Sequence, residues 1–449
     1  MRTLPVIPFS LARPRASAHG RAPMRALFVV VAACSGSSSS SMPDAPPLAP
    51  TPNKAREVID TQLKVDVAAM TAHATITLAA GDAGASLEVG DLMIDSVTAA
   101  GVAVPFAIAS KQMDLGLAAS SEQVALDVAY HFKTHEQFDG DSMTGFTFLW
   151  PYFCGNLFPC HSAPSDGTTF ALALDGVPAG KTAVFPASIP NEAPSYQIAW
   201  SIGAYTELPL GTTSAGTKVS VWYLPTEQTA AMTGTANLVA AFDWLEKTIG
   251  PYRFGDHVGT VSVAWPRGAF GGMEHHPRWH VGSSSLDDQV TNVHESAHGW
   301  FGDGIRIQCW EDFVLSEGTV SYLAARALDV VAPSAGSAAW QEYQTELSQV
   351  PGDDPVWPQS CGTIDVLNDN LFTNAPYMRG AFFYKALADK LGAAAVDQVL
   401  ATFYRDHAGG AATMQQMLDT IHMVTGYDAT ACAQTWLRST TRPTPAPCP

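Results

Sequence analysis

The sequence predicts a multidomain protein in which an N-terminal all-β, sandwich-like domain is followed by an α+β domain. Its 449 residues exceed what a single hydrophobic core usually organises, so we expect two or three domains. Up to about residue 205, short runs of alternating apolar and polar residues favour strands. From about residue 286 onward, longer runs favour helices. The order of these two patterns places the β domain first.

The expected strands are rich in β-branched and apolar residues and are separated by Gly, Pro, Asp and Ser. Examples in the first domain are Ala74–Leu78, Val124–Val128 and Phe170–Leu174. A further strand pair is expected at Val219–Tyr223 and Val258–Trp265, at the start of the second domain.

Helices are expected to make up most of the second domain. The first lies between the last two strands and stops at a Gly-Pro pair, because proline disfavours continuation of a helix. The expected helices span Thr226–Ile249, Asp288–Phe301, Glu311–Val330, Ala338–Leu347, Met378–Leu391, Val396–Arg405, Met414–Thr425 and Ala429–Leu437.

The first residues resemble an export signal. Arg21 and Arg25 precede an apolar run, Ala26–Ala33, which is too short to span a bilayer and ends at Cys34. The tetrapeptide that ends at Cys34 resembles a bacterial lipobox, and the Ser- and Pro-rich residues after it suit a flexible tether. An ordinary signal peptide with an incidental cysteine is the alternative. We expect an exported bacterial lipoprotein, in the outer membrane, the periplasm or at the cell surface, whose only membrane contact is a lipid on Cys34.

The net charge limits which partners the protein can bind, and the cysteine content indicates the compartment in which it folds. Acidic residues outnumber basic ones 42 to 24, and the formal net charge of −18 would repel a nucleic acid. The cysteines other than Cys34 form an even set, as expected for disulfides in an oxidising compartment. We expect a monomer. Of the many possible pairings, the local one joins Cys154 with Cys160, Cys309 with Cys361 and Cys432 with Cys448.

A metal site is indicated at residues 294–298, which read H-E-S-A-H on a segment with helical character. Histidines four positions apart lie on one face of a helix, so the imidazoles of His294 and His298 can reach one ion. Glu295 lies about 100° around the helix and would stand beside the ion rather than on it. Two histidines with ordinary surface or core partners are the alternative interpretation.

Zinc catalysis needs a third protein ligand and an open position for water. Glu317, on the next expected helix with 18 residues between it and His298, can supply that ligand. The three side chains would hold one Zn²⁺ ion. Glu295 would then take a proton from the attacking water and deliver it to a leaving amine.

Five patches of the sequence resemble the aminopeptidase N family of zinc metallopeptidases, a gluzincin group that includes leukotriene hydrolase. They follow the order of the family along the chain. The patches are F-P-C with a proline four residues on (Phe158–Pro164), G-G-M-E-H for the family's G-A-M-E-N (Gly271–His275), H-E-S-A-H-G-W-F-G-D for H-E-x-x-H-Q-W-F-G-N (His294–Asp303), L-S-E-G for L-N-E-G (Leu315–Gly318), and Y-M-R-G for Y-x-K-G (Tyr377–Gly380).

The resemblance implies roles for further residues. It implies that Glu274 binds the free α-amine of a peptide and that Tyr377 donates a hydrogen bond to the oxyanion of the tetrahedral intermediate. It also implies that the α+β domain is thermolysin-like, with the site in the cleft between the domains. The substrate-binding segment is Gly271, Gly272, Met273 and Glu274, which can also pair with the peptide backbone as an edge strand.

With these roles the chain divides into five predicted parts. They are a signal peptide at residues 1–33, a lipid-anchored Ser/Pro-rich linker at 34–55, an N-terminal β domain at 56–210, a thermolysin-like zinc catalytic domain at 211–440, and an irregular tail at 441–449.

Three functions remain open at this point. The first is an aminopeptidase that acts on peptides, the second a thermolysin-type zinc endopeptidase that needs no free amine, and the third a peptidase-like binding module without turnover. Intact Glu295 and Tyr377 argue against the third. Outside their motifs, Tyr377 would be interpreted as a core aromatic and Glu274 as a solvated surface acid. His275, His276 and His280 suggest either a second metal site or, more simply, a polar groove wall.

Overall fold

The computed structural model describes residues 48–449, except for residues 137, 266–269, 353, 355, 370 and 442. The expected signal peptide, Cys34 and the first part of the linker lie outside the described residues. Among the residues that are described, no helix is both long enough and apolar enough to cross a membrane.

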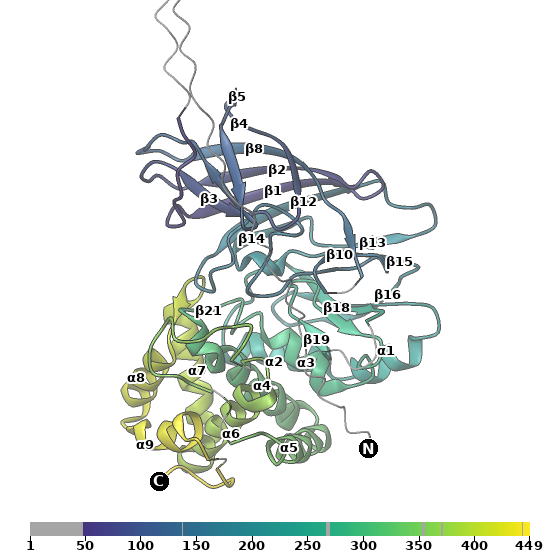
Figure 1. Cartoon of the computed structure of the whole chain (residues 1–449). Helices are drawn as coiled ribbons and strands as arrows, with labels where there is room; N and C mark the ends of the chain where they lie inside the picture. Colours follow the sequence, from purple (N-terminus) through teal and green to yellow (C-terminus); the bar gives the residue numbers. More distant parts are fainter. Residues whose placement is uncertain are drawn as a thin grey trace, which may run out of the picture. The chain divides into compact units, whose positions relative to one another are not determined.

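A seven-stranded sheet organises the first region (Figure 1). Along β1, Leu63 and Val65 are buried while Lys64 between them is exposed, so one face of the sheet packs on the core. Most neighbouring strands are antiparallel, but β1 and β12 run parallel, with Leu63 opposite Leu172. In spatial order the sheet consists of β14 (Ser188–Ala193), β12 (Thr168–Asp175), β1 (Val58–Asp66), β2 (Thr71–Leu78), β8 (Val124–His131), β4 (Met93–Ala99) and β5 (Val102–Ala103).

A second sheet of three strands shares this core. Leu87 and Met113 belong to the same hydrophobic cluster as Leu63 and Ile76 of the large sheet. Two β layers around one core agree with the predicted all-β, sandwich-like domain. The second sheet consists of β3 (Ala85–Glu88), β7 (Gln112–Leu115) and β6 (Phe106–Ala109), and the remaining short elements are β9 (Thr134–His135), β10 (Gly140–Ser142), β11 (Thr147–Phe148), β13 (Thr182–Val184), β15 (Ser201–Gly203) and the 3₁₀ turn η1 (Ser195–Gln197).

The second region begins with a five-stranded mixed sheet. The two expected strands are its neighbours β17 and β18, which run parallel with Val219 opposite Val258. The two-residue strand β19 forms one edge and pairs with β20 in the antiparallel sense, with Met273 opposite His280. In spatial order the sheet is β16 (Thr206–Thr212), β17 (Lys218–Tyr223), β18 (His257–Val263), β20 (His280–Gly282) and β19 (Gly272–Met273).

The helix expected at residues 226–249 is two helices, so the predicted continuity is wrong. The first, α1 (Gln228–Gly234), ends at a glycine, and α2 (Leu238–Thr248) begins after a short break. A Cβ added to Gly234 would lie 1.9 Å from the carbonyl oxygen of Leu286. Close packing against that backbone therefore requires glycine at this position.

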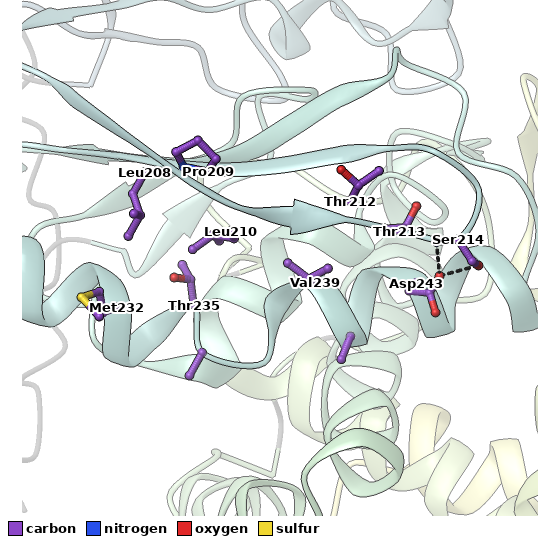
Figure 2. A pocket seen from close by; sticks show the side chains of 12 residues that line it. Leu208, Pro209, Leu210, Thr212, Thr213, Ser214, Met232, Thr235, Val239 and Asp243 are labelled. Carbon is purple, nitrogen blue, oxygen red and sulfur yellow. Dashed lines mark hydrogen bonds between the residues drawn. The ribbon is translucent and has the colours of Figure 1, made fainter.

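An open hollow of about 490 Å³ lies between β16 and these two helices (Figure 2). Leu208 of β16, Met232 of α1 and Val239 of α2 contribute to its apolar walls. At one end Asp243 accepts hydrogen bonds from the backbone nitrogen and the hydroxyl of Ser214. None of the predicted site residues lines this hollow.

The helix α4 is central to the C-terminal part of the fold. It packs against α3, α5 and α6, and every residue from 313 to 325 is buried. Where α4 meets α6, a Cβ added to Gly318 would lie 2.6 Å from the Cα of Gly380, so two glycines allow the backbones to approach. The bounds are α3 (Gln289–Ala297), β21 (Arg306–Ile307), η2 (Trp310–Asp312), α4 (Phe313–Val331), α5 (Pro333–Leu347), α6 (Asn374–Leu391), α7 (Ala393–His407), β22 (Ala411–Ala412), α8 (Met414–Thr425), α9 (Thr430–Ala433) and the π-helical turn η3 (Gln434–Arg438).

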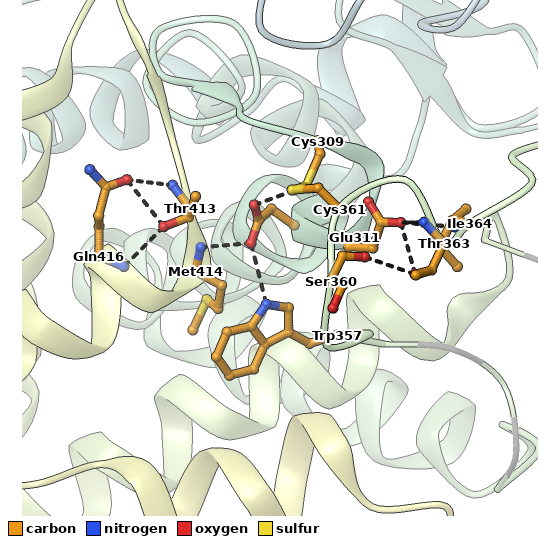
Figure 3. Close-up of a disulfide and its surroundings, with 11 residues drawn as sticks. Cys309, Glu311, Trp357, Ser360, Cys361, Thr363, Ile364, Thr413, Met414 and Gln416 are labelled. Atoms are coloured by element: carbon orange, nitrogen blue, oxygen red, sulfur yellow. Dashed lines mark hydrogen bonds between the residues drawn. A yellow bond between two sulfur atoms is a disulfide. The ribbon is translucent and has the colours of Figure 1, made fainter.

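Three disulfides join the pairs that the sequence suggested, Cys154–Cys160, Cys309–Cys361 and Cys432–Cys448. The second ties the segment before α4 to the long connection between α5 and α6 (Figure 3). Beside it, the Glu311 carboxylate accepts a hydrogen bond from the backbone nitrogen of Ile364 at 2.8 Å. The Asp312 carboxylate accepts one from the Trp357 indole at 3.3 Å. This connection is therefore held against the start of α4.

Candidate metal centre

The helix α3 places the two predicted histidines on one face. Asp288 caps its N-terminus and accepts hydrogen bonds from the backbone nitrogens of Val290 and Thr291. The helix ends at Ala297, and His298 follows as C-cap with helical backbone angles, so the i, i+4 spacing is kept. The Nε2 atoms of His294 and His298 lie 3.2 Å apart.

The helix α4 brings the third predicted ligand to these nitrogens. Glu317 Oε2 lies 3.2 Å from His294 Nε2 and 3.4 Å from His298 Nε2. These three side chains are a group whose potential ligand atoms all lie within 4.8 Å of one another. The packing of α3 against α4 therefore brings together His298 and Glu317, which have 18 residues between them in the sequence, in a single cluster.

The donor set of this cluster fits a zinc ion. Two imidazole nitrogens and one carboxylate oxygen are the protein ligands of many catalytic zinc sites. Glu317 Oε2 is buried and has no well-aligned hydrogen bond to the residues that the structure describes. His298 Nδ1 faces the carbonyl oxygen of Phe301 at 3.1 Å, which leaves Nε2 turned towards the cluster. A cation among these three side chains would satisfy the buried oxygen.

The charges of the cluster are strongly coupled. Burial would raise the pKa of the Glu317 carboxyl, but the adjacent imidazoles of His298 and His294 outweigh burial and lower that pKa to about 2. For His298, burial acts to lower the pKa, but the carboxylates of Glu274 and Glu317 dominate and raise it well above its ordinary value. The site favours positive charge at its centre.

Glu295 projects beside the cluster rather than into it. The Glu295 side chain is buried. Together with the Glu274 carboxylate and the His298 ring it forms a second group, whose potential ligand atoms all lie within 4.8 Å of one another. A Cβ added to Gly272 would lie 2.4 Å from the Glu295 carboxyl group, so strand β19 passes directly against this side chain. Burial raises the pKa of Glu295 well above its ordinary value; the charge of His298 acts in the opposite direction, and the carboxylates of Glu274 and Glu317 add to the increase.

The predicted substrate-binding segment lies along β19. Gly271 precedes this edge strand, Gly272 and Met273 form it, and Glu274 follows directly. The Glu274 side chain is buried, with 6% exposure, which excludes the alternative of a solvated surface acid. A small hollow beside it is lined by both regions, with Pro151 and Tyr196 from the first and Trp310, Phe313 and Glu317 from the second.

Tyr377 lies at the other side of the histidines. It is in the first turn of α6, and its ring stacks on that of His294 with centroids 6.0 Å apart and an interplanar angle of 21°. Phe313 packs against it edge-on at 6.0 Å. Burial and the nearby Glu317 carboxylate raise the pKa of Tyr377 well above its ordinary value, so the phenol keeps its proton. Because the Tyr377 ring stacks on a predicted metal ligand, Tyr377 is not simply an aromatic residue of the core.

The three histidines near Glu274 form neither a second metal cluster nor a groove wall. His275, His276 and His280 are all buried, with exposure of 1%, 0% and 0%. Among the described parts of the chain, none of them belongs to a group of three potential metal ligands. Burial lowers the pKa of His275 and of His276 to about 3, so both rings are neutral. His276 instead places Nε2 2.8 Å from the carbonyl oxygen of Glu295.

Two residues of the site were missed by sequence reasoning. The Tyr196 hydroxyl lies 2.8 Å from Glu274 Oε1 and 3.0 Å from Asp303 Oδ1. Asp303 is the last residue of the motif around His294, which was a signal for its position though not for its role. Tyr196 belongs to the first region and no motif marks it.

The fold and this site define a class of protein. Two histidines four positions apart on one helix, a glutamate from the following helix and a second glutamate beside them are the arrangement typical of zinc metallopeptidases. Comparison with known proteins leads to the same class. Residues 264–436 match the family model described as "Peptidase family M1 domain", which confirms the predicted resemblance to this group of peptidases.

Several curated relatives are aminopeptidases. Aminopeptidase B of Rattus norvegicus is 29% identical over 261 residues, which cover 52% of this chain and 39% of that protein. Leucine aminopeptidase 2 of Neurospora crassa is 25% identical over 282 residues, which cover 56% of this chain and 40% of that protein. The chain thus spans less than half the length of these relatives.

Several solved structures share the fold of this chain. The M1 zinc metallopeptidase from Deinococcus radiodurans aligns with a TM-score of 0.73 at 19% identity, over 87% of this chain and 96% of that one. Yeast LTA4 hydrolase in complex with bestatin aligns with a TM-score of 0.70 at 20% identity, over 86% of this chain and 68% of that one. The predicted fold, a β-rich domain followed by a largely helical α+β region, is confirmed.

Proposed function

We propose that this protein is a zinc-dependent aminopeptidase that removes N-terminal residues from peptides. The observation that carries the proposal is the meeting of His294, His298 and Glu317 within bonding reach of one cation, with Glu295 and Glu274 directly beside them. The match of residues 264–436 to the peptidase M1 family model supports the choice of metal, as does the fold shared with a zinc metallopeptidase. A single ion is proposed, because the nitrogens of both histidines and the Glu317 oxygen converge on one point.

Glu295 and Tyr377 would each have a separate role in the reaction. When bound, zinc supplies Lewis-acid catalysis by polarising the scissile carbonyl and activating water. Glu295 would accept the proton of the attacking water and pass it to the leaving amine. Tyr377, which remains a phenol, would donate a hydrogen bond to the developing oxyanion.

Recognition of the peptide terminus would fall to the other side of the site. Glu274 offers a buried carboxylate within 4.8 Å of Glu295 and His298, where the free α-amine can form a charge-assisted contact. The strand β19 is an edge of its sheet, so Gly272 and Met273 can add the peptide backbone as a further strand. A carboxylate at this place favours an exopeptidase over a thermolysin-type endopeptidase.

The test compares free and blocked substrates. Zinc-loaded protein should hydrolyse an amino-acid anilide at least about a hundredfold faster than the N-acetylated anilide, since the blocked substrate cannot pair with Glu274. In Glu295→Gln, metal analysis should find the zinc retained while hydrolysis falls by several orders of magnitude. Equal rates on both substrates would indicate an endopeptidase, and zinc-loaded protein without turnover on any peptide would indicate a binding module.

We also propose that the protein is an exported, monomeric lipoprotein anchored through Cys34. Three disulfides support an oxidising compartment. Expression in a Gram-negative host should place the protein in the membrane fraction, and Cys34→Ser should release it into the soluble fraction. A Cys34→Ser protein that stays with the membrane would contradict the anchor.

A further inference from the structure

The turn η1 holds the segment that carries Glu274 through three consecutive contacts. The Tyr196 hydroxyl lies 2.8 Å from Glu274 Oε1. The Tyr196 carbonyl oxygen lies 2.8 Å from His275 Nδ1, and Gln197 Nε2 donates to the carbonyl oxygen of His276 at 3.1 Å. A turn of the first region therefore contacts residues 274, 275 and 276 of the second, one after another.

The contact to Glu274 involves the side chain that the proposed function uses. Tyr196 is 8% exposed and Glu274 is 6% exposed, so water competes little for their hydrogen bond. A hydrogen bond from a neutral phenol to a buried carboxylate is among the stronger kinds. It restricts the rotation of the Glu274 side chain before any substrate is bound.

A second carboxylate limits how the phenol can be used. Asp303 is fully buried, and its Oδ1 lies 3.0 Å from the Tyr196 oxygen. A phenol has one proton, so it can donate to only one of the two carboxylates at a time. The bond to Glu274 is the shorter of the two. The three oxygens form a chain that runs from Asp303 through Tyr196 to the amine-binding side of the site.

We propose that Tyr196 is a positioning residue for amine recognition. It holds the Glu274 carboxylate in the orientation that meets the α-amine of the peptide, and so makes recognition depend on the first region. This inference rests on the proposed function, because it requires Glu274 to bind an amine. A purely structural role would predict that Tyr196→Phe lowers stability and leaves amine preference unchanged.

The experiment measures binding without turnover. In the full-length, zinc-loaded Glu295→Gln protein, calorimetry gives the dissociation constants of alanyl-phenylalanine amide and of its N-acetyl derivative. We expect tighter binding of the free amine, and we expect Tyr196→Phe to weaken that binding roughly tenfold while the affinity for the acetylated peptide stays within about twofold. In the active protein, the same substitution should raise KM for an anilide and change kcat by less than about threefold.

Tyr130→Phe is the matched control. Tyr130 is also buried in the first region, and its hydroxyl donates to the carbonyl oxygen of Leu157 at 3.0 Å. Its loss should leave the preference for the free amine at the parental value. The inference is overturned if Tyr196→Phe keeps that preference, or if Tyr130→Phe lowers it equally. If the Glu295→Gln parent itself shows no preference, the proposed aminopeptidase function fails first, and this inference fails with it.

Discussion

The two sides of the site are built in different ways. The metal side consists of His294, His298 and Glu317, which lie on two sequential helices packed against each other. The recognition side consists of Glu274 after a two-residue edge strand and of Tyr196 from a turn of the first region. Two regular helices, close in the sequence and packed together, therefore position all three residues of the metal side. The recognition side exists only where two regions meet, so it can vary without disturbing the metal ligands.

Glycines permit close approach on both sides. On the metal side, Gly318 and Gly380 allow α4 and α6 to touch next to Glu317 and Tyr377. On the recognition side, Gly272 allows β19 to pass against Glu295, because a side chain there would overlap its carboxyl group. Glycine thus serves helix packing in one place and the close approach of a strand to Glu295 in the other.

The largest effect is expected from a substitution that disrupts only the metal side. Glu317→Gln replaces a charged ligand by a neutral amide, so bound zinc should fall below about a tenth of an ion per chain and hydrolysis by roughly a thousandfold or more. Metal analysis after dialysis and an anilide assay measure both. Glu274→Gln makes the same chemical change on the recognition side and should keep its zinc. Equal loss of metal in both variants would contradict the division into two sides.

Tyr377→Phe should give the next largest effect. Removal of one oxyanion donor lowers kcat by about 100- to 1000-fold in comparable sites, and KM should change little. Steady-state kinetics on an anilide measures both constants. Tyr384→Phe removes another buried hydroxyl of α6, which accepts from Thr319 at 2.9 Å, and kcat should remain within about threefold of the parent. A similar fall in kcat for the two variants would show that α6 packing, not the phenol, is responsible.

The disulfides give a smaller, structural comparison. Cys309–Cys361 closes a separation of 52 residues beside the metal side, and Cys154–Cys160 closes one of 6 in the first region. By loop entropy, the unfolding free energy should fall by about 4 kcal/mol when the first pair is replaced by serine and by about 2 kcal/mol for the second. Urea unfolding measures both losses. The reverse order would mean that native packing, rather than loop closure, dominates.

The smallest expected effect concerns Asp141 in the first region. Burial raises its pKa from 3.8 to about 7, and the nearby Trp200 offsets only part of this shift. Between about pH 4 and pH 7 the folded protein therefore binds more protons than the unfolded chain, so this group makes the protein less stable as the pH rises. Asp141→Asn removes the titrating group. Relative to the parent, the unfolding free energy of this variant should rise by about 2 kcal/mol as the pH increases from 4 to 8, after allowance for partial exposure.

Urea unfolding at several pH values checks this prediction. The matched control is Asp127→Asn, in strand β8 of the same region, whose exposed carboxylate accepts a hydrogen bond from Thr75 at 2.9 Å. A difference between Asp141→Asn and the parent that stays constant over this pH range would show that the carboxyl group titrates normally in the folded state.

Much of the fold could be predicted because its periodicities are strong. The strands around Ile76, Leu126 and Leu172 were found from alternation, and the buried helix α4 from its long apolar run. The requirement for glycine at position 234, where α1 ends, could not be found, because it comes from the backbone of Leu286, which is far along the chain. The burial of His276 was missed because its partners, Gln197 and Glu295, are also distant in the sequence.

For this protein, the sequence by itself determined that His294 and His298 share one face of a helix, while the packing of α3 against α4 decided that Glu317 meets them. A helix carries residues four positions apart on one face whatever surrounds it, so His294, His298 and the flanking Glu295 were identifiable from spacing alone. Only the tertiary structure decided what holds Glu274. Hydrogen bonds such as that from Tyr196 join residues 78 positions apart, and no local pattern records which distant side chains will meet in a water-poor interior.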